Sequence, residues 1–393
     1  MTLPSAPGFS GTRPRWKQSR WKQPHWKPFS RKRPGWMPTL FCLGMLWSLL
    51  PRTGTAADPT AARQVPAGTA SGETRSDPAR SGSTPGQAAG QAYVFAYFNT
   101  GKSGESQGLQ LAYSHDGLDW MAIPAPDGTF LKPTVGGKLL RDPSIVAGPD
   151  GIFHMVWTTD WWRHGIGLAH STDLIHWSTQ NYLDVMHDFP GTLNCWAPEI
   201  TYDADRQTYL IYWASTIPGA FPQTEASGDE IKAAKARANH RIYLTTTQDF
   251  KTYTPTRLLY DDGYNVIDAF ITADPQRQRF VMVLKDETRF PVPHKNLRLA
   301  FASHPEGPWS PGTPPFSPDW VEGAAILKVG DRWLLYFDAY TRHRYEGLST
   351  TDFEHWTPIT DQLMMPDGMR HGTPFPVPEA VLQKLLSAAP AQP

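Results

Sequence analysis

The 393-residue sequence predicts an all-β fold, a five-bladed β-propeller that spans residues 91–378. Three observations predict it. A turn motif followed by an aromatic residue occurs five times, an acidic strand motif alternates with it, and no convincing helical period appears before about residue 379. Repeats of this size, each about four short strands long, are typical of propellers. A β-sandwich is the structural alternative, but it gives no reason for two motifs to alternate.

The first motif reads apolar-x-apolar, a small residue, Ser or Thr, any residue and Asp, with an aromatic residue a few places later. Its aromatic positions are separated by 57, 76, 56 and 47 residues, and the fourth copy is degenerate. These positions are Trp120, Trp177, Tyr253, Trp309 and Trp356. The strand-like segment Tyr93–Tyr97 precedes the first copy. We expect this strand, near residues 92–98, to complete the last blade and close the ring.

The second motif places an acidic residue just before a strand-like apolar run, at intervals of 57, 69 and 54 residues. The acids are Asp142, Glu199, Asp268 and Glu322, and His371 holds the equivalent position in the fifth blade. Any one of these acids alone is adequately explained as a turn or cap residue. Because the innermost strands of a propeller all run the same way, four acids in register predict one pocket at the mouth of the central channel.

The N-terminal 57 residues contain ten Lys or Arg and no Asp or Glu, in a short repeat around Trp16, Trp21 and Trp26. An apolar segment, Met37 to Leu50, and several small residues follow; the segment is too short to span a bilayer. This order is typical of a secretory signal peptide, so we expect removal of residues 1–57 and a secreted or periplasmic protein with no membrane contact afterwards. An uncleaved anchor and a basic arm with its own function are the alternatives.

Composition divides the rest of the chain. Residues 58–90 are mainly Ala, Gly, Ser, Thr, Pro and Arg, a composition that predicts a disordered linker. Residues 379–393 predict a short helix and a tail. The whole chain has zero net charge, but without residues 1–57 it holds 27 basic and 37 acidic side chains, a net charge of −10. This charge disfavours nucleic acid and other polyanions as partners.

A ring of carboxylates in a cleft can bind a metal ion or perform acid–base catalysis. Hydrolysis of a glycosidic bond needs one protonated acid for the leaving oxygen and one carboxylate that activates water or attacks the sugar. Sugars stack on aromatic side chains, in which the channel region is rich. The residues expected to bind substrate are Arg141, Trp161, Trp196, Glu199 and Phe221. We therefore expect an oligo- or polysaccharide substrate.

Five short strings carry a family resemblance: Arg141-Asp142-Pro143, Trp196-Ala197-Pro198-Glu199, Val266-Ile267-Asp268-Ala269, Val321-Glu322-Gly323 and His371-Gly372. With them, residues 91–378 resemble glycoside hydrolase family 43, the β-xylosidase and α-L-arabinofuranosidase group of five-bladed propellers. The resemblance implies an inverting hydrolase that releases xylose or arabinofuranose from plant-type glycans.

The resemblance also implies a role for each catalytic residue. Asp142 would be the general base that activates water, Glu322 the general acid, and Asp268 the residue that tunes the pKa and orients the acid. Inversion implies about 6.5–9.5 Å between the carboxyl groups of Asp142 and Glu322. No cofactor is required for this chemistry. His371 resembles a histidine that faces a central ion, often calcium, although a buried, hydrogen-bonded histidine explains it equally well.

Departures from the family pattern leave the sugar open. Ala269, and either Ala324 or Ala325, stand where the family often has Pro, and Glu199 stands where many members have Asp. A fructan- or galactan-active propeller glycosidase and a non-catalytic sugar-binding propeller are the alternatives; the second would predict loss of a catalytic carboxylate, and none is lost. The long insert, residues 216–239, is expected between the second and third blades, where a wall on one side of the pocket would favour exo action.

Overall fold

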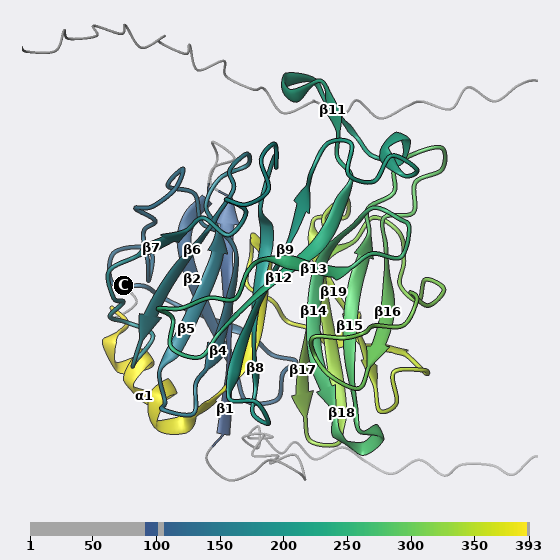
Figure 1. Ribbon diagram of the computed structural model, residues 1–393. Helices are drawn as coiled ribbons and strands as arrows, with labels where there is room; N and C mark the ends of the chain where they lie inside the picture. The colour runs from purple at the N-terminus through teal and green to yellow at the C-terminus, as the bar shows by residue number, and fades with distance from the viewer. Residues whose placement is uncertain (1–90, 101–105, 391–393) are drawn as a thin grey trace, which may run out of the picture. The chain divides into compact units, whose positions relative to one another are not determined.

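The computed structural model describes residues 91–100 and 106–390, which form a five-bladed β-propeller with very little helix (Figure 1). This confirms the predicted fold class. The expected signal peptide (1–57) and linker (58–90) lie outside the described residues.

Each blade is an antiparallel sheet whose strands follow one another from the channel outwards. The first blade is β21 (Met369–Pro378), β1 (Gln91–Thr100), β2 (Ser106–Ser114) and β3 (Met121–Ile123). The second is β4 (Arg141–Ala147), β5 (Phe153–Thr158), β6 (Ile166–Ser171) and β7 (Asn181–Leu183). The third is β8 (Trp196–Asp203), β9 (Thr208–Thr216), β12 (His240–Thr247) and β13 (Arg257–Tyr260). The fourth is β14 (Val266–Asp274), β15 (Arg279–Asp286) and β16 (Asn296–Ala302). The fifth is β17 (Glu322–Val329), β18 (Arg332–Ala339), β19 (Arg344–Thr350) and β20 (Thr357–Pro358).

The two ends of the propeller close the ring within one sheet. Strand β1 pairs with β2 on one side and with β21, from the other end of the chain, on its other side. The predicted closing strand is therefore confirmed: β1 shares a blade with the last inner strand, β21. This blade, which holds His371, is the one predicted as the fifth, and it is numbered first because it contains β1. The inner strands β21, β4, β8, β14 and β17 contact one another in this order around the channel, and β17 contacts β21 again.

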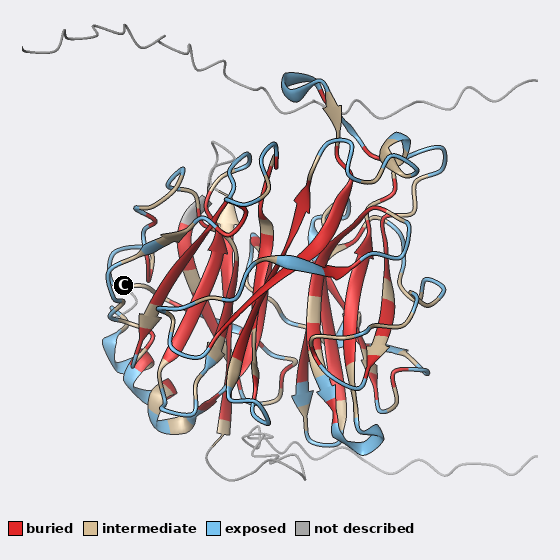
Figure 2. Ribbon diagram, viewed as in Figure 1, coloured by how far each residue is buried: buried red, intermediate tan, exposed pale blue. Residues whose placement is uncertain are grey.

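The hydrophobic core is divided into five clusters, each lying between two neighbouring blades. Successive side chains of a strand point to opposite faces of its sheet, so each strand supplies two clusters. In β1, Val94 and Phe98 pack toward the second blade, whereas Phe95 and Tyr97 pack toward the fifth. Figure 2 shows the result, with buried strands and exposed loops at both ends. Burial on both faces explains why these strands lack a polar side.

The repeated turn motif closes the third strand of four blades and has a structural role. In the first copy the Ser114 hydroxyl accepts from the Gly117 amide, and the Asp116 carboxylate accepts from the amides of Leu118 and Asp119. The copies around Asp173, Asp249 and Asp352 repeat these bonds. Asp and Ser favour such turns because their side chains replace the missing backbone partners.

The long insert forms a small projection on the third blade. It contains two 3-10 turns, Glu225–Ser227 and Lys232–Ala234, and a hairpin of β10 (Glu230–Ile231) and β11 (Ala236–Arg237). It connects β9 to β12, which pair with each other, so the prediction that it separates two blades is wrong: it lies within one. The spacing of the turn motifs shows only that extra residues are present, and not which strands they join.

Two further 3-10 turns, Pro275–Arg277 and Thr360–Gln362, lie in loops, and the α-helix α1 (Glu379–Ala388) follows β21. Leu382 and Leu385 of α1 are buried in the cluster between the first and second blades. No helix among the described residues has the length and apolar character needed to cross a membrane.

Candidate active site

The inner strands all carry a bulge at the same end of the channel. Pairing with the second strand stops for two residues and then resumes, as between Arg141 and Ser144 in β4. The first residue of the bulge has a left-handed backbone in four strands, with φ values of 49° at Asp142, 45° at Ala197, 51° at Asp268 and 60° at Gly323. Non-glycine residues rarely adopt this conformation, and such strain often accompanies functional sites.

The bulges correct the predicted register of the acids. Asp142, Asp268 and His371 occupy the same place, directly after the last paired residue. Glu322 lies one position earlier, opposite Asp338, and Glu199 lies two positions later, where pairing resumes. The expectation that all four acids share one position is therefore wrong. Intervals between acids include loops of different length, so similar intervals do not require the same place in the strand.

Asp142 and His371 form an ion pair at the mouth of the channel. The imidazole Nδ1 lies 3.4 Å from one carboxylate oxygen, and the Thr158 hydroxyl donates to the other at 2.8 Å. Burial alone would raise the pKa of Asp142, but the bond to His371 and its positive charge outweigh burial and lower that pKa to about 2. The reciprocal effect outweighs burial at His371 and raises its pKa to about 9. Asp142 is therefore ionised at neutral pH, and 13% of its side chain is exposed.

His371 is paired with Asp142 and packs closely against a neighbouring strand. Its ring lies against Gly323, where an added Cβ would lie only 2.4 Å from the ring. Among residues 91–100 and 106–390, no three His, Cys, Asp or Glu side chains are grouped to hold an ion. The structural calcium implied by the resemblance remains a prediction.

Glu322 lies between two cations. Its Oε2 accepts from the Lys285 ammonium at 2.9 Å, and its Oε1 lies 3.4 Å from the Arg370 guanidinium. Burial would raise the pKa of Glu322, but the charge and hydrogen bond of Lys285 outweigh it, so this pKa is lower than usual. The side chain is 25% exposed.

A second layer of acids holds those cations. Lys285 is buried, and its ammonium lies 2.8 Å from the Glu287 carboxylate as well. Arg370 donates to Asp338 at 2.5 Å. Sequence reasoning missed Lys285, although a signal exists: it ends the otherwise apolar run Phe280–Leu284 of β15. A lysine in a buried strand requires partners, and such residues are almost never buried unpaired.

Asp268 lies in the bulge of β14, where the charges of both Asp142 and Glu322 act on it. One of its carboxylate oxygens accepts from the amide of Gly323, the residue after Glu322, at 2.9 Å. Burial raises the pKa of Asp268 to about 6, although the positive charges of His371 and Lys285 oppose this increase. The structure therefore brings Asp268 beside the backbone that carries Glu322.

Glu199 lies deeper in the channel, where it is only 4% exposed. The Ser144 hydroxyl donates to it at 2.5 Å, and the Thr373 hydroxyl contacts both of its oxygens at 3.3 and 3.4 Å. Burial raises its pKa to about 8. The structure does not bring this predicted substrate-binding residue to the solvent-facing part of the site.

The aromatic residues near Asp142 form a platform that comprises Trp161, Trp162 and Trp196. Trp161 and Trp162 are each 47% exposed, and the Trp196 indole donates to the Trp161 carbonyl at 2.8 Å. The Arg141 guanidinium lies 4.5 Å from the centre of the Trp161 ring. Phe221 lies in the insert, where its ring lies 4.3 Å from the Arg241 guanidinium. Three of the predicted substrate-binding residues, Arg141, Trp161 and Trp196, thus lie together, and Arg141 directly precedes Asp142 in β4. Phe221 contacts Arg241 instead.

A family model described as a probable glycosyl hydrolase domain, related to glycoside hydrolase family 43, matches residues 89–382. The chain belongs to this family. The match includes all five inner strands and every catalytic residue expected from the sequence. Membership in this family agrees with the predicted resemblance.

Solved structures of related folds include enzymes with several substrates. An exo-β-1,3-galactanase from Phanerochaete chrysosporium shares 11% identity at a TM-score of 0.44, over 60% of this chain and 52% of its own. A xylan β-1,4-xylosidase from Bacillus halodurans shares 20% identity at a TM-score of 0.41, over 56% of this chain and 41% of its own. An α-L-arabinofuranosidase from Lactobacillus brevis shares 20% identity at a TM-score of 0.41, over 56% of this chain and 72% of its own. The chain thus matches about half the length of the galactanase. No curated protein matches the chain.

Proposed function

We propose that this protein is a glycoside hydrolase that releases terminal xylose or arabinofuranose from a glycan, with inversion of configuration. The observation that carries the proposal is that Asp142 and Glu322 lie at the same end of the channel, partly exposed, in different electrostatic surroundings. Such a pair can divide the roles of base and acid. Family membership supports the class of reaction, and the sugar is taken from the sequence resemblance.

Asp142 is suited to activate water. His371 keeps it ionised, so it can accept a proton from a water molecule as the water oxygen attacks the anomeric carbon. Thr158 occupies one of its oxygens and thereby orients the carboxylate. The Thr158 hydroxyl also accepts from the Ala197 amide at 2.9 Å, which ties the base to the neighbouring inner strand.

Glu322 is suited to protonate the leaving oxygen, provided that it carries a proton. As the bond between the anomeric carbon and the glycosidic oxygen breaks, the proton of Glu322 moves to that oxygen. The water proton accepted by Asp142 balances this transfer. Because Lys285 lowers the pKa of Glu322, the protonated acid is populated mainly under acidic conditions, and we expect an acidic pH optimum.

The remaining features support a neutral carbohydrate substrate. The platform of Trp161, Trp162 and Trp196 offers exposed rings on which sugars stack. The propeller and its C-terminal tail are acidic, which disfavours nucleic acid and other polyanions. The signal-like N-terminus supports action outside the cytoplasm.

A sugar-binding propeller without catalytic activity is the second candidate. The ion pair between Glu322 and Lys285 favours it, since an acid held ionised by a buried ammonium protonates a leaving group poorly. The two candidates differ in turnover and not in sugar binding.

The experiment is a panel of aryl glycosides: β-xyloside, α-arabinofuranoside, β-galactoside and β-fructofuranoside. We expect release of the aryl alcohol from one of the first two, most rapidly at acidic pH, and inversion of the released sugar by proton NMR. Glu322→Gln should lower kcat on that substrate. Undiminished activity in this variant would contradict the catalytic assignment, whereas no turnover of any glycoside between pH 3 and 8 would favour the binding propeller.

A further inference from the structure

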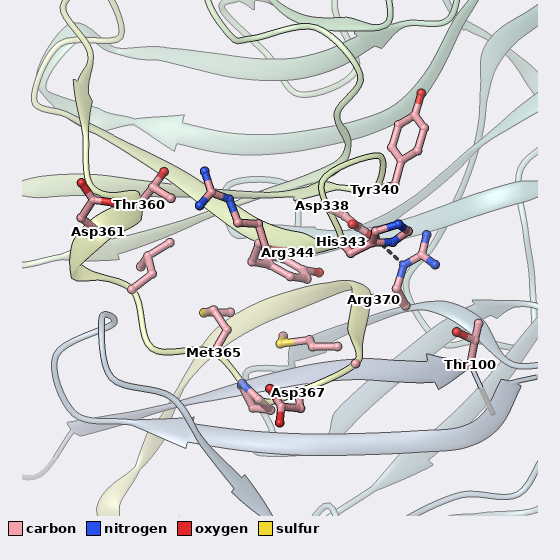
Figure 3. Close-up of a pocket in the computed structure, with 15 residues that line it drawn as sticks. Thr100, Asp338, Tyr340, His343, Arg344, Thr360, Asp361, Met365, Asp367 and Arg370 are labelled. Carbon is pink, nitrogen blue, oxygen red and sulfur yellow. Dashed lines mark hydrogen bonds and ion pairs between the residues drawn. The ribbon is translucent and has the colours of Figure 1, made fainter. Parts of the chain in front are cut away.

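A cavity of about 460 Å³ opens at the catalytic end of the propeller, between the fifth and first blades (Figure 3). It is bounded by the start of β21, the turn between β18 and β19, and the loop of residues 360–368 that follows β20. Its volume lies in the range of ligand-binding pockets. None of Asp142, Asp268, His371 and the tryptophan platform lines it.

The cavity adjoins Glu322 through two of its lining residues. Arg370 lines the cavity, and its guanidinium lies 3.4 Å from Glu322. Asp338 lines it too, pairs with Glu322 across the two inner strands of the blade, and accepts from Arg370, as the dashed line in Figure 3 shows. The inner end of the cavity is therefore formed by two residues that neighbour the proposed acid.

The other lining residues suit a neutral ligand rich in hydroxyl groups. Asp361 and Asp367 are exposed carboxylates on the loop, and neither has a hydrogen-bond or ion-pair partner among the described residues. Arg344 is already bound to Glu346. Leu363 and Met365 add apolar surface beside them. Unpaired acceptors next to apolar surface can bind the hydroxyl groups of a sugar.

We propose that this cavity binds the leaving group, the sugar on the far side of the bond that is cleaved. The inference rests on the proposed function, in which Glu322 donates its proton to the glycosidic oxygen. Whatever is attached to that oxygen must continue past Glu322 and away from the water held by Asp142. The cavity begins at Arg370, which contacts Glu322, whereas the tryptophan platform lies against Arg141, the residue before Asp142. A glycan therefore lies across the channel mouth, from the platform to the cavity.

The test compares two substrates with the same cleaved sugar: a disaccharide, such as xylobiose, and the corresponding glycosyl fluoride. Fluoride is a single atom and cannot occupy the cavity. The double variant Asp361→Ala/Asp367→Ala should lose about tenfold in kcat/KM on the disaccharide, since two hydrogen bonds are removed, and less than twofold on the fluoride. Met365→Trp, which fills the cavity, should show the same selectivity.

Asp127→Ala is the matched control, because Asp127 is exposed in a loop outside the cavity. This change should leave kcat/KM unaltered on both the disaccharide and the glycosyl fluoride. Equal losses on both substrates, or no loss on the disaccharide, in correctly folded variants would overturn the proposal. If the wild type hydrolyses no glycoside, saturation-transfer NMR with xylobiose, arabinobiose and galactobiose replaces kinetics. A signal weakened in the double variant then supports the cavity as a sugar site although the hydrolase fails, and an unchanged or absent signal overturns it.

Discussion

At the scale of single residues, the state of Glu322 depends on the charges around it. Lys285 and Arg370 stabilise its ionised form, whereas the neighbouring Glu287 disfavours it. The main partner of Asp142 is His371, which lowers the pKa of Asp142 to about 2, so this carboxylate is ionised above that pH. Asp142 is therefore ionised at any pH well above 2. The protonation of Glu322 then sets the pH range in which both groups have the required form.

Removing Lys285 should widen that range. In Lys285→Met the pKa of Glu322 rises because its nearest cation is lost, so the protonated acid persists to higher pH. The alkaline limb of kcat/KM should move to higher pH, and the acid limb, set by Asp142, should stay. Lys132→Met, at an exposed lysine, is the control. An alkaline limb that does not move would show that Glu322 is not the group that titrates there.

How far the sequence predicts this site also depends on single residues. Asp142, Asp268 and His371 are found because each lies in a recognisable motif near the start of an inner strand. Lys285 comes from the second strand of its blade, outside any motif, and meets Glu322 only through the packing of two blades. Contacts of this kind depend on side-chain positions that residue spacing does not encode.

At the scale of elements, the inner-strand bulges decide which side chains reach the channel mouth. The turn motif predicts the blades because its hydrogen bonds are local and recur in four of the five copies. The bulges are less readable, since the residue that adopts the left-handed backbone differs between strands, from Asp142 to Ala197 and Gly323. This is why Glu199 and Glu322 were expected in the wrong register.

Where β1 and β21 pair to close the ring, Gly372 is a position at which a larger residue should destabilise the fold. A Cβ at Gly372 would lie 1.9 Å from the Ala96 carbonyl oxygen, so Gly372→Ala must separate the two strands. We expect a loss of about 2 kcal/mol or more in the free energy of unfolding, and a lower Tm by calorimetry. Gly151→Ala is the control: its Cβ meets nothing within 4 Å, and its φ of 78° costs only about 1 kcal/mol. Equal effects of the two changes would contradict this account of ring closure.

At the scale of the whole molecule, the channel concentrates buried ionisable groups. Folding raises the pKa of Asp268 to about 6, of Glu199 to about 8 and of His371 to about 9, against ordinary values of 3.8, 4.5 and 6.5. A group whose pKa is raised by folding stabilises the fold below its ordinary pKa, and this stability is lost as the pH rises through the folded value. Asp142 acts in the opposite sense, and its contribution is lost only as the pH falls toward 2.

Thermal stability should therefore be greatest near pH 4–5 and fall by several degrees in Tm toward pH 9. Glu199→Gln removes the contribution that titrates between pH 4.5 and 8, because glutamine does not ionise, so its Tm should fall less over that interval. The measurement is Tm by circular dichroism at pH 5, 7 and 9 for both proteins. A Tm that rises from pH 5 to pH 9 would contradict the assignment of these channel groups.

The most direct test of the central claim, that Glu322 protonates the leaving oxygen, compares leaving groups in Glu322→Gln. A dinitrophenyl glycoside needs little protonation, whereas a methyl glycoside of the same sugar needs a full proton. We predict a loss of about a hundredfold or more in kcat/KM on the methyl glycoside and less than tenfold on the dinitrophenyl glycoside. The same loss on both substrates, or no loss on either, would contradict the account.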